Sequence, residues 1–209
     1  MWRVIEHDYR ICALNLSMQE STSKSIISRK PKGYYKQGIS HCGAFAVKAV
    51  LESYGKDDGR EPRDYHPTFF GKMTGLTLGF DYWPPVLRSF GISAQAHKAD
   101  NLNPEGKIQL LKNLLSKNNP VMLRIGNGYD ASGRYNKIQG KMIAHWITLW
   151  GYDDARKIFY VYDPCLSTGK QAMLPIGNTT RTYQEIIRDW HRAVFSLVAG
   201  QSVYIQIDQ

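Results

Sequence analysis

The segment from Gln37 to Gly55 constrains the fold of this chain more than any other stretch. After Gly43, apolar residues recur at steps of three and four positions, at Ala46, Val47, Val50, Leu51 and Tyr54. This is the period of an α-helix with one buried face. Gly55 follows the last apolar position and favours a left-handed helix end. The sequence therefore predicts a buried helix that begins near Cys42.

Cys42 falls at or beside the first turn of this predicted helix. Backbone N–H groups there have no helical partners and the helix dipole is positive there, so both favour the thiolate over the thiol. A cysteine in such a position is a candidate nucleophile. The alternative is that Cys42 is only a small buried hydrophobic residue. A candidate general base elsewhere in the chain would favour the nucleophile.

A predicted β-hairpin supplies that base. Two runs rich in β-forming residues, at 141–150 and 157–163, flank a short polar turn at 151–156. His145 lies in the first run and Asp163 ends the second, and the midpoint between them, residue 154, lies in the turn. Antiparallel pairing about this turn predicts that the two residues are cross-strand neighbours.

These residue types together form a recognisable chemical arrangement. A carboxylate beside an imidazole fixes its tautomer and leaves the other ring nitrogen for a thiol. Cys42, His145 and Asp163 therefore have the nucleophile, base and orienting group of covalent catalysis. Gln37, just upstream of Cys42, has a side-chain amide that is able to help hold an oxyanion.

The rest of the chain predicts a mixture of helices and strands. We expect a short helix within 81–91, a strand at 92–97, a helix between 103 and 118, a strand at 121–125, a surface loop at 126–140, a loop at 165–180, a helix at 183–194 and a last strand at 202–207. Cys165 directly follows Asp163 and Pro164. An approach to the site is one interpretation of this position, but a structural role is favoured.

Composition and charge exclude several classes of protein. The net charge of +9 comes from scattered basic residues without the signature of a nucleic-acid module, so nucleic-acid binding is not expected. No stretch approaches the ~18 apolar residues of a membrane span, and charges interrupt the N-terminal segment where a signal peptide is apolar. We expect a cytoplasmic protein, with export by a non-cleaved route left open.

The cysteine and histidine pattern predicts neither disulfides nor a metal site. Cys12, Cys42 and Cys165 cannot form a complete disulfide framework, which favours a reducing compartment. His7 and His66 have no partners at metal-ligand spacing. No metal or cofactor is therefore expected.

The order of these motifs resembles a known family. Gln37, then His41-Cys42-Gly43-Ala44, Asn119-Pro-Val-Met, the run from Ala144 to Asp153 and finally Val161-Tyr-Asp-Pro164 are similar to the papain-like cysteine peptidases that process bacteriocins at double-glycine leaders. The closest likeness is to their stand-alone relatives, over residues 37–195. The resemblance implies an α+β papain-like fold, in which a helix that carries the catalytic cysteine packs on an antiparallel sheet.

The resemblance also implies roles and boundaries. Cys42 is the implied nucleophile, His145 the base, Asp163 the orienting residue and Gln37 the oxyanion donor. The chain is expected to be one domain over 1–209, with a lead-in at 1–36, a catalytic core at 37–195 and a terminal strand at 196–209.

Two features depart from the family pattern. The glutamine commonly lies six positions before the cysteine, whereas Gln37 lies five before Cys42, and the residue before the cysteine is commonly acidic or an amide, whereas here it is His41. His41 is an exposed loop residue, an alternative charge partner or a substrate contact. Together with Gly43 and Trp146, it is a candidate substrate-binding residue.

We therefore predict a cysteine peptidase that cleaves peptide or protein substrates through a thioester acyl-enzyme. Two alternatives remain open. One is a thiol-dependent acyltransferase, similar to transglutaminases or phytochelatin synthases, and the other is a catalytically silent domain that binds partners through a basic surface. The substrate, the oligomeric state and the setting, whether a bacterial protease, a secreted effector or a toxin, are left open.

Overall fold

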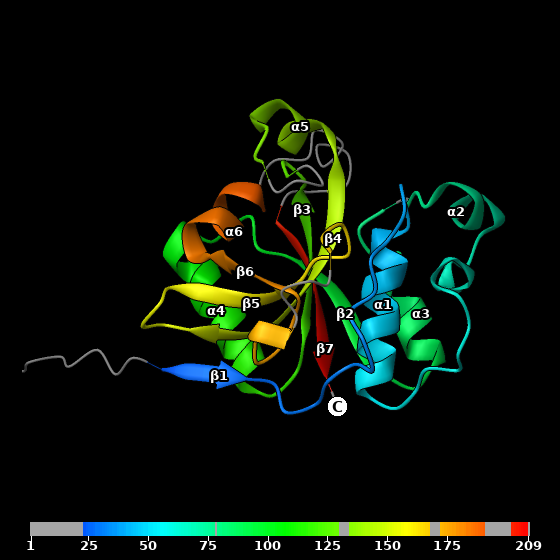
Figure 1. The fold of residues 1–209 in the computed structure, drawn as a ribbon, viewed down its shortest axis with the longest axis horizontal. Coiled ribbons are helices and arrows are strands. Elements are labelled where there is room, and N and C mark those ends of the chain that lie inside the picture. Colours follow the sequence, from blue (N-terminus) through cyan, green and yellow to red (C-terminus); the bar gives the residue numbers. More distant parts are fainter. Residues whose placement is uncertain (1–22, 78, 130–133, 168–171, 191–201, 209) are drawn as a thin grey trace, which may run out of the picture.

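An antiparallel sheet forms the centre of the protein (Figure 1). The structure is a computed structural model that describes residues 23–77, 79–129, 134–167, 172–190 and 202–208. In this part of the chain the sheet has seven strands, in the order β2-β7-β3-β4-β5-β6, and β1 pairs with the end of β4. The strands are β1 (Lys24–Ile26), β2 (Ser93–Lys98), β3 (Val121–Gly126), β4 (Ala144–Asp153), β5 (Ile158–Tyr162), β6 (Thr179–Thr182) and β7 (Val203–Asp208).

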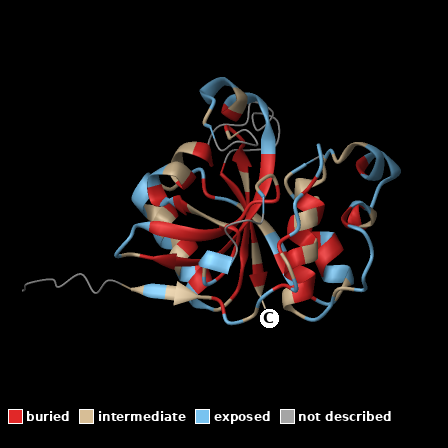
Figure 2. Ribbon diagram, in the orientation of Figure 1, coloured by how far each residue is buried: buried red, intermediate tan, exposed pale blue. Residues whose placement is uncertain are grey.

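Helices cover both faces of the sheet, and the alternation of strand residues separates two cores. The helices are α1 (Cys42–Ser53), α2 (Phe69–Thr74), α3 (Pro84–Ser89), α4 (Pro104–Ser116), α5 (Lys137–Met142) and α6 (Tyr183–Asp189), with a 3-10 turn at Pro62–Tyr65. Met122 and Trp146 pack with α1 and α3, whereas the next residues, Leu123 and Ile147, pack with α4 and α6. The buried strands and the inner sides of these helices are visible in Figure 2.

The predicted helix after Gln37 is confirmed as α1, which packs against the sheet. Its apolar stripe is fully buried, at Ala46, Val47, Val50 and Leu51, and Gly55 has the expected positive φ of 65°. The helix start is closely packed, because a Cβ on Gly43 would overlap the indole of Trp83. His41, the N-cap, has a φ of 75° and makes no side-chain cap.

The predicted hairpin is present as β4 and β5, but its predicted register is wrong. Thr148 pairs with Tyr162, and a bulge follows before Gly151 pairs with Tyr160. This register would place Asp163 opposite Ile147 rather than opposite His145. The contact between Asp163 and His145 survives because residues 145 and 147 lie on the same side of a strand. A bulge inserts a residue that the alternation of apolar residues does not reveal.

Two further expectations need correction, and a third is described only in part. The loop expected at 126–140 and the strand expected from 141 are interrupted by α5, whose first N–H groups are capped by Asn136. The loop expected at 165–180 runs into β6. The helix expected at 183–194 is described as α6 only to Asp189. The lead-in residues 1–22, which include His7 and Cys12, lie outside the described part of the chain, as do residues 191–194.

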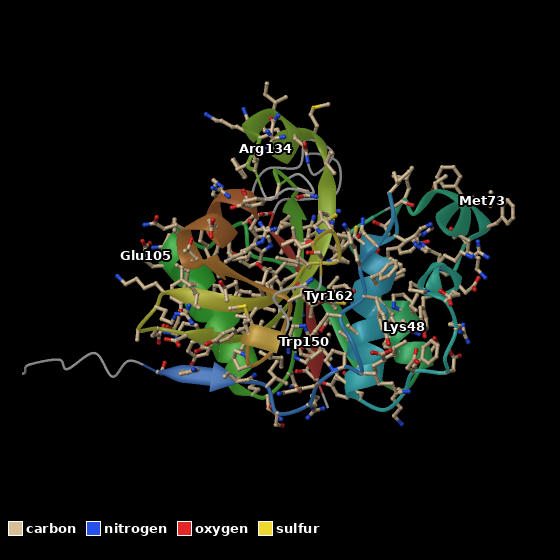
Figure 3. All side chains as sticks on the ribbon, in the orientation of Figure 1. Lys48, Met73, Glu105, Arg134, Trp150 and Tyr162 are labelled. Atoms are coloured by element: carbon tan, nitrogen blue, oxygen red, sulfur yellow. The ribbon has the colours of Figure 1, made fainter. Side chains whose placement is uncertain are left out.

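No helix among the residues that the structure describes is both long enough and apolar enough to cross a membrane. The outward sides of α2 and α5 nevertheless carry large exposed apolar side chains. These are Phe69, Phe70 and Met73 on α2, Leu76 just after it, and Ile138 and Met142 on α5, followed by Ile143. Figure 3 shows Met73 pointing away from the body of the protein.

Candidate active site

Cys42 is the first residue of α1 and lies beside the start of β4. The residue is half-buried, and its thiol accepts a hydrogen bond from the backbone N–H of Trp146, with 3.4 Å between N and Sγ. Burial alone would raise the pKa of this thiol. The charge of His145, a hydrogen bond with its imidazole and the N–H groups of Trp146 and Gly43 outweigh burial, so the pKa of Cys42 is lowered. The site therefore favours a thiolate.

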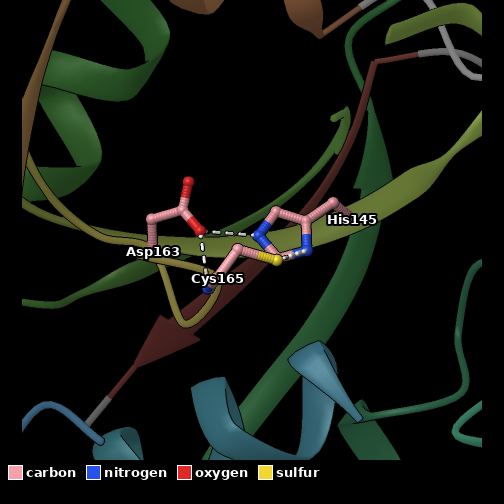
Figure 4. A group of neighbouring side chains, drawn as sticks. All are labelled: His145, Asp163 and Cys165. Atoms are coloured by element: carbon pink, nitrogen blue, oxygen red, sulfur yellow. Dashed lines mark hydrogen bonds and ion pairs between the residues drawn. The ribbon is translucent and has the colours of Figure 1, made fainter. Parts of the chain in front are cut away.

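His145 is the second residue of β4, and its side chain is only 2% exposed. Its Nε2 lies 2.8 Å from Oδ1 of Asp163, just past the end of β5 (Figure 4). Burial would lower the pKa of the imidazole, but the negative charges of Asp163 and Cys42 outweigh it and raise the pKa well above its usual value. Because Nε2 is engaged by the carboxylate, Nδ1 is the nitrogen left for a thiol.

Asp163 is held from several directions. Arg181 on β6 donates from Nη2 to Oδ2 at 2.5 Å, and the backbone N–H of Cys165 donates to Oδ1 at 3.0 Å. Asn178 accepts from the backbone N–H of Asp163 and donates to its carbonyl, each at 2.9 Å. Burial would raise the pKa of Asp163, but His145 and Arg181 hold it well below its ordinary value. The carboxylate therefore stays ionised beside the imidazole.

Sequence reasoning missed Arg181 and the charges behind it. The guanidinium is buried, and its Nη1 lies 3.4 Å from Oδ2 of Asp189 on α6. Oδ1 of Asp189 in turn accepts from Nε of Arg188 at 2.8 Å. The sequence does indicate a strand at this position, because the β-branched residues of Thr-Thr-Arg-Thr at 179–182 favour one.

Cys165 is also part of the site, although a structural role was expected for it. The residue is half-buried. Its Sγ lies 3.8 Å from Nδ1 of His145 (Figure 4), and Nδ2 of Asn127 donates to it at 3.5 Å. One ring nitrogen of His145, one carboxylate oxygen of Asp163 and Sγ of Cys165 all lie within 4.8 Å of one another. The imidazole thus has a second thiol as a neighbour.

Gln37 lies against the segment that carries Asp163. It is 8% exposed, and its backbone N–H donates to the carbonyl of Pro164 at 2.8 Å. The side-chain Oε1 of Gln37 is buried without a hydrogen-bond partner among the described residues.

The three candidate substrate-binding residues have different surroundings. His41 is half-buried, and its Nδ1 lies 3.2 Å from Nε2 of buried His66. Burial lowers the pKa of His41 and, more strongly, that of His66, to about 4, so both rings are favoured in the neutral form. The side chain of Trp146 packs in the core and only its N–H reaches Cys42, while Gly43 is buried against Trp83.

Comparison with known proteins places this chain in a family. The model of the Peptidase_C39 like family matches residues 32–195, most of the 209-residue chain. The chain belongs to this family. No curated protein sequence matched it.

Two solved structures are similar to the chain. One is a C39-like peptidase, as it is described, from Bacillus anthracis, with 11% sequence identity and a TM-score of 0.55 over 90% of this chain and 98% of that one. The other is a double glycine motif protease from an AMS/PCAT transporter, solved in complex with the leader peptide, with 15% identity and a TM-score of 0.49 over 88% of this chain and 97% of that one. The predicted α+β papain-like fold and the predicted resemblance to the double-glycine leader peptidases are confirmed.

Proposed function

We propose that the protein is a cysteine peptidase in which Cys42, His145 and Asp163 act as nucleophile, base and orienting residue. One observation carries the proposal: the thiol at the start of α1 accepts a hydrogen bond from the backbone N–H of Trp146, directly after His145, whose buried imidazole is bonded to a carboxylate. The charge of that imidazole lowers the pKa of the thiol. Membership of the Peptidase_C39 like family gives independent support.

In this mechanism the Cys42 thiolate attacks the carbonyl carbon of a peptide bond. The imidazolium of His145 then gives its Nδ1 proton to the leaving amine, and a thioester acyl-enzyme remains. The neutral imidazole next takes a proton from water, and the hydroxide releases the acyl group and frees the thiolate. Asp163 remains ionised throughout and engages Nε2, so that Nδ1 is left to exchange protons with the thiol.

The oxyanion of the tetrahedral intermediate needs hydrogen-bond donors. We assign the backbone N–H of Cys42, which has no helical partner at this position, and the side-chain amide of Gln37. The burial of Gln37 and the bond from its N–H to Pro164 fix its backbone beside the site despite its short spacing from Cys42.

A peptide substrate is favoured by the surface next to the nucleophile. A hollow of about 330 Å³ lies beside the start of α1 and is lined by residues 38–41, Phe45 and residues 61–63. The side chain of Ile39 is fully exposed at its edge. Gly75, at the end of α2, packs so closely on His41 that a Cβ there would overlap its backbone. The exposed apolar side chains of α2 therefore belong to the same region, and we assign them to apolar residues of the substrate.

The test is cleavage of a pool of unstructured peptides that includes double-glycine sequences, followed by mass spectrometry. We expect Cys42→Ala and His145→Ala to lower the cleavage rate roughly 10⁴-fold or more. Gln37→Ala is expected to lower it about 10²–10³-fold, as for loss of one oxyanion donor. The matched control is Cys12→Ala, which removes a thiol without a proposed role and should leave the rate unchanged.

Product analysis separates hydrolysis from the alternatives. Added amine or glutathione should not appear in the products if water is the acceptor, whereas its incorporation would identify an acyltransferase. A folded protein that cleaves no peptide and whose Cys42 reacts like a free thiol would contradict the proposal and favour a binding domain.

A further inference from the structure

We propose that Asp189 is a positioning residue, which holds Arg181 in place so that Arg181 fixes the carboxylate of Asp163. That carboxylate in turn orients the imidazole of His145. Among the described residues, no hydrogen bond joins Asp189 to the imidazole or to Asp163 itself, so it acts through Arg181. The effect on cleavage rests on the proposed peptidase function, whereas the effect on the imidazole can be measured without a substrate.

Arg181 lies between two buried carboxylates. Its Nη2 donates to Oδ2 of Asp163 at 2.5 Å, and its Nη1 donates to Oδ2 of Asp189 at 3.4 Å. The side chains of Asp163 and Asp189 are each 1% exposed, and that of Arg181 is 4% exposed. The ring of Tyr129 covers the guanidinium, with 4.5 Å between the ring centre and Cζ. The guanidinium is therefore held by three partners, of which only Asp163 belongs to the site.

Asp189 is itself fixed by its neighbours. Arg188 donates to Oδ1 from Nε at 2.8 Å and to Oδ2 from Nη2 at 2.9 Å. The hydroxyl of Tyr135 donates to Oδ1 at 2.9 Å. The guanidinium of Arg188 also covers the ring of Tyr135, with 3.8 Å between Cζ and the ring centre. Because both oxygens of Asp189 are held in this way, Asp189 is able to set the position of Arg181.

Stability alone does not explain a carboxylate at position 189. Replacing a buried network of charges by apolar side chains of similar volume is often neutral or stabilising. Asp189 is also the last residue of α6, where the negative end of the helix dipole disfavours a carboxylate. Orientation of a catalytic carboxylate through Arg181 is a role that apolar side chains would not fill.

The side chain of Asp163 is the part of the site that needs this support. Its backbone N–H and carbonyl are both bonded to Asn178, so the side-chain torsions are left to be set. Oδ1 faces Nε2 of His145 and the N–H of Cys165, while Oδ2 accepts from Arg181. If Arg181 moves, the carboxylate is free to turn and the imidazole loses a fixed partner. A misplacement of about 1 Å is able to cost about 10²-fold in rate.

The charges behind Arg181 also act on the imidazole of His145. Burial would lower the pKa of this ring, but the negative charges of Asp163 and Cys42 and a hydrogen bond with Cys165 raise it well above its usual value. A negative charge removed from behind Arg181 makes the imidazolium less favourable and lowers this pKa. A positive charge removed from the same place raises it.

Nuclear magnetic resonance of the His145 ring tests the proposal without a substrate. The full chain is used, the proton on Nε2 and the titration of the ring are recorded, and His145→Gln assigns the signals. Asp189→Asn should lower the pKa of His145, and Arg188→Gln should raise it. A charge within about 4–6 Å shifts a pKa by about 1–3 units, and these charges lie beyond Arg181, so each shift should be at most about 1 pH unit.

Two further variants complete this test. Arg188 has a side chain that is 30% exposed, so Arg188→Gln still tests the proposal if Asp189→Asn does not fold. The matched control is Glu105→Gln, which removes a negative charge from an exposed position on α4 (Figure 3) and should leave the pKa of His145 unchanged. An unchanged pKa in both network variants, or shifts in the same direction, would overturn the proposal.

Cleavage assays then measure the effect on rate. Asp189→Ala should lower kcat by up to about 10²-fold and leave KM unchanged. Asp189→Asn keeps an oxygen for Arg181 and should restore most of the rate. Cleavage by Asp189→Ala at the wild-type rate would contradict the positioning role. Opposite pKa shifts in a protein that cleaves no peptide would contradict the peptidase function and support the action of Asp189 on the imidazole.

Discussion

The two halves of the site are held in different ways. His145 and Asp163 belong to the strand half, where β4, β5 and β6 pair side by side and both side chains are fully buried. Cys42 belongs to the helix half, where a half-buried thiol begins α1 and the preceding residue, His41, makes no side-chain cap. Buried charges fix the first half, whereas packing fixes the second.

This difference shows how stability and access are divided between the two halves. The strand half keeps a carboxylate ionised in the interior by facing it with His145 and Arg181, at the cost of desolvating all of these charges. In the helix half, the charge of His145 lowers the pKa of the Cys42 thiol. His41, next to Cys42, packs on Gly75 at the end of α2, the helix that carries exposed apolar side chains. A substrate is expected to approach from the helix half.

The largest effect should follow from removing a charge in the strand half. Arg181→Ala leaves the carboxylates of Asp163 and Asp189 without this buried partner. Such a loss costs about 3–5 kcal/mol of unfolding free energy. Urea denaturation followed by circular dichroism measures it. Arg181→Lys keeps the positive charge but cannot contact both carboxylates through two nitrogens. Its loss of unfolding free energy should therefore be smaller than that of Arg181→Ala.

A half-exposed ion pair gives the matched control. Lys24 lies 3.6 Å from Asp153 on the outer part of the sheet. Lys24→Ala should change the unfolding free energy by no more than about 1 kcal/mol. Equal losses for Lys24→Ala and Arg181→Ala would mean that buried charges do not hold the strand half.

A smaller effect is expected from the packing of the helix half. In Gly43→Ala the new methyl group overlaps the indole of Trp83, and such overpacking costs about 1–3 kcal/mol. The same variant should slow alkylation of Cys42, because the helix start has to shift. Thermal unfolding and the alkylation rate measure the two effects.

Gly38→Ala is the control for this variant, since a Cβ on Gly38 meets nothing within 4 Å. Its unfolding free energy should stay within about 0.5 kcal/mol of the wild type. Adding Trp83→Phe to Gly43→Ala should restore part of the alkylation rate by making room. A double variant as slow as Gly43→Ala alone would argue against the overlap as the cause.

The helix half was easier to predict from sequence than the strand half, for a physical reason. The stripe of α1 and the stop at Gly55 are local patterns, and they were predicted correctly. The contact between His145 and Asp163 was predicted from a symmetric register that the bulge near residue 150 makes wrong. Arg181 reaches the site through the path of the chain after β5, which no local pattern encodes, whereas Cys165 is near it because it follows Asp163 by two residues.

The smallest effect on stability is expected on the open surface of the helix half. Phe69 is 81% exposed and Met73 is 67% exposed, so Phe69→Ser or Met73→Ser should change the unfolding free energy by less than about 0.5 kcal/mol. If α2 contacts the substrate, KM for an apolar peptide should rise while kcat stays the same. An unchanged KM would remove α2 from the substrate site, and Ile138→Ser on α5 serves as the matched exposed control.

The pH dependence of Cys42 alkylation by iodoacetamide tests the central claim most directly. The modified Cys42 peptide is followed by mass spectrometry, so the other two cysteines do not interfere. A thiolate is present above its pKa, and the charge of His145 lowers that pKa, so wild-type Cys42 should already react at a pH below the ~8.5 at which a free thiol ionises. His145→Ala should move the profile up to the free-thiol value or above it, because burial remains. A wild-type profile at the free-thiol value, or one that His145→Ala leaves in place, would contradict the thiolate–imidazolium pair.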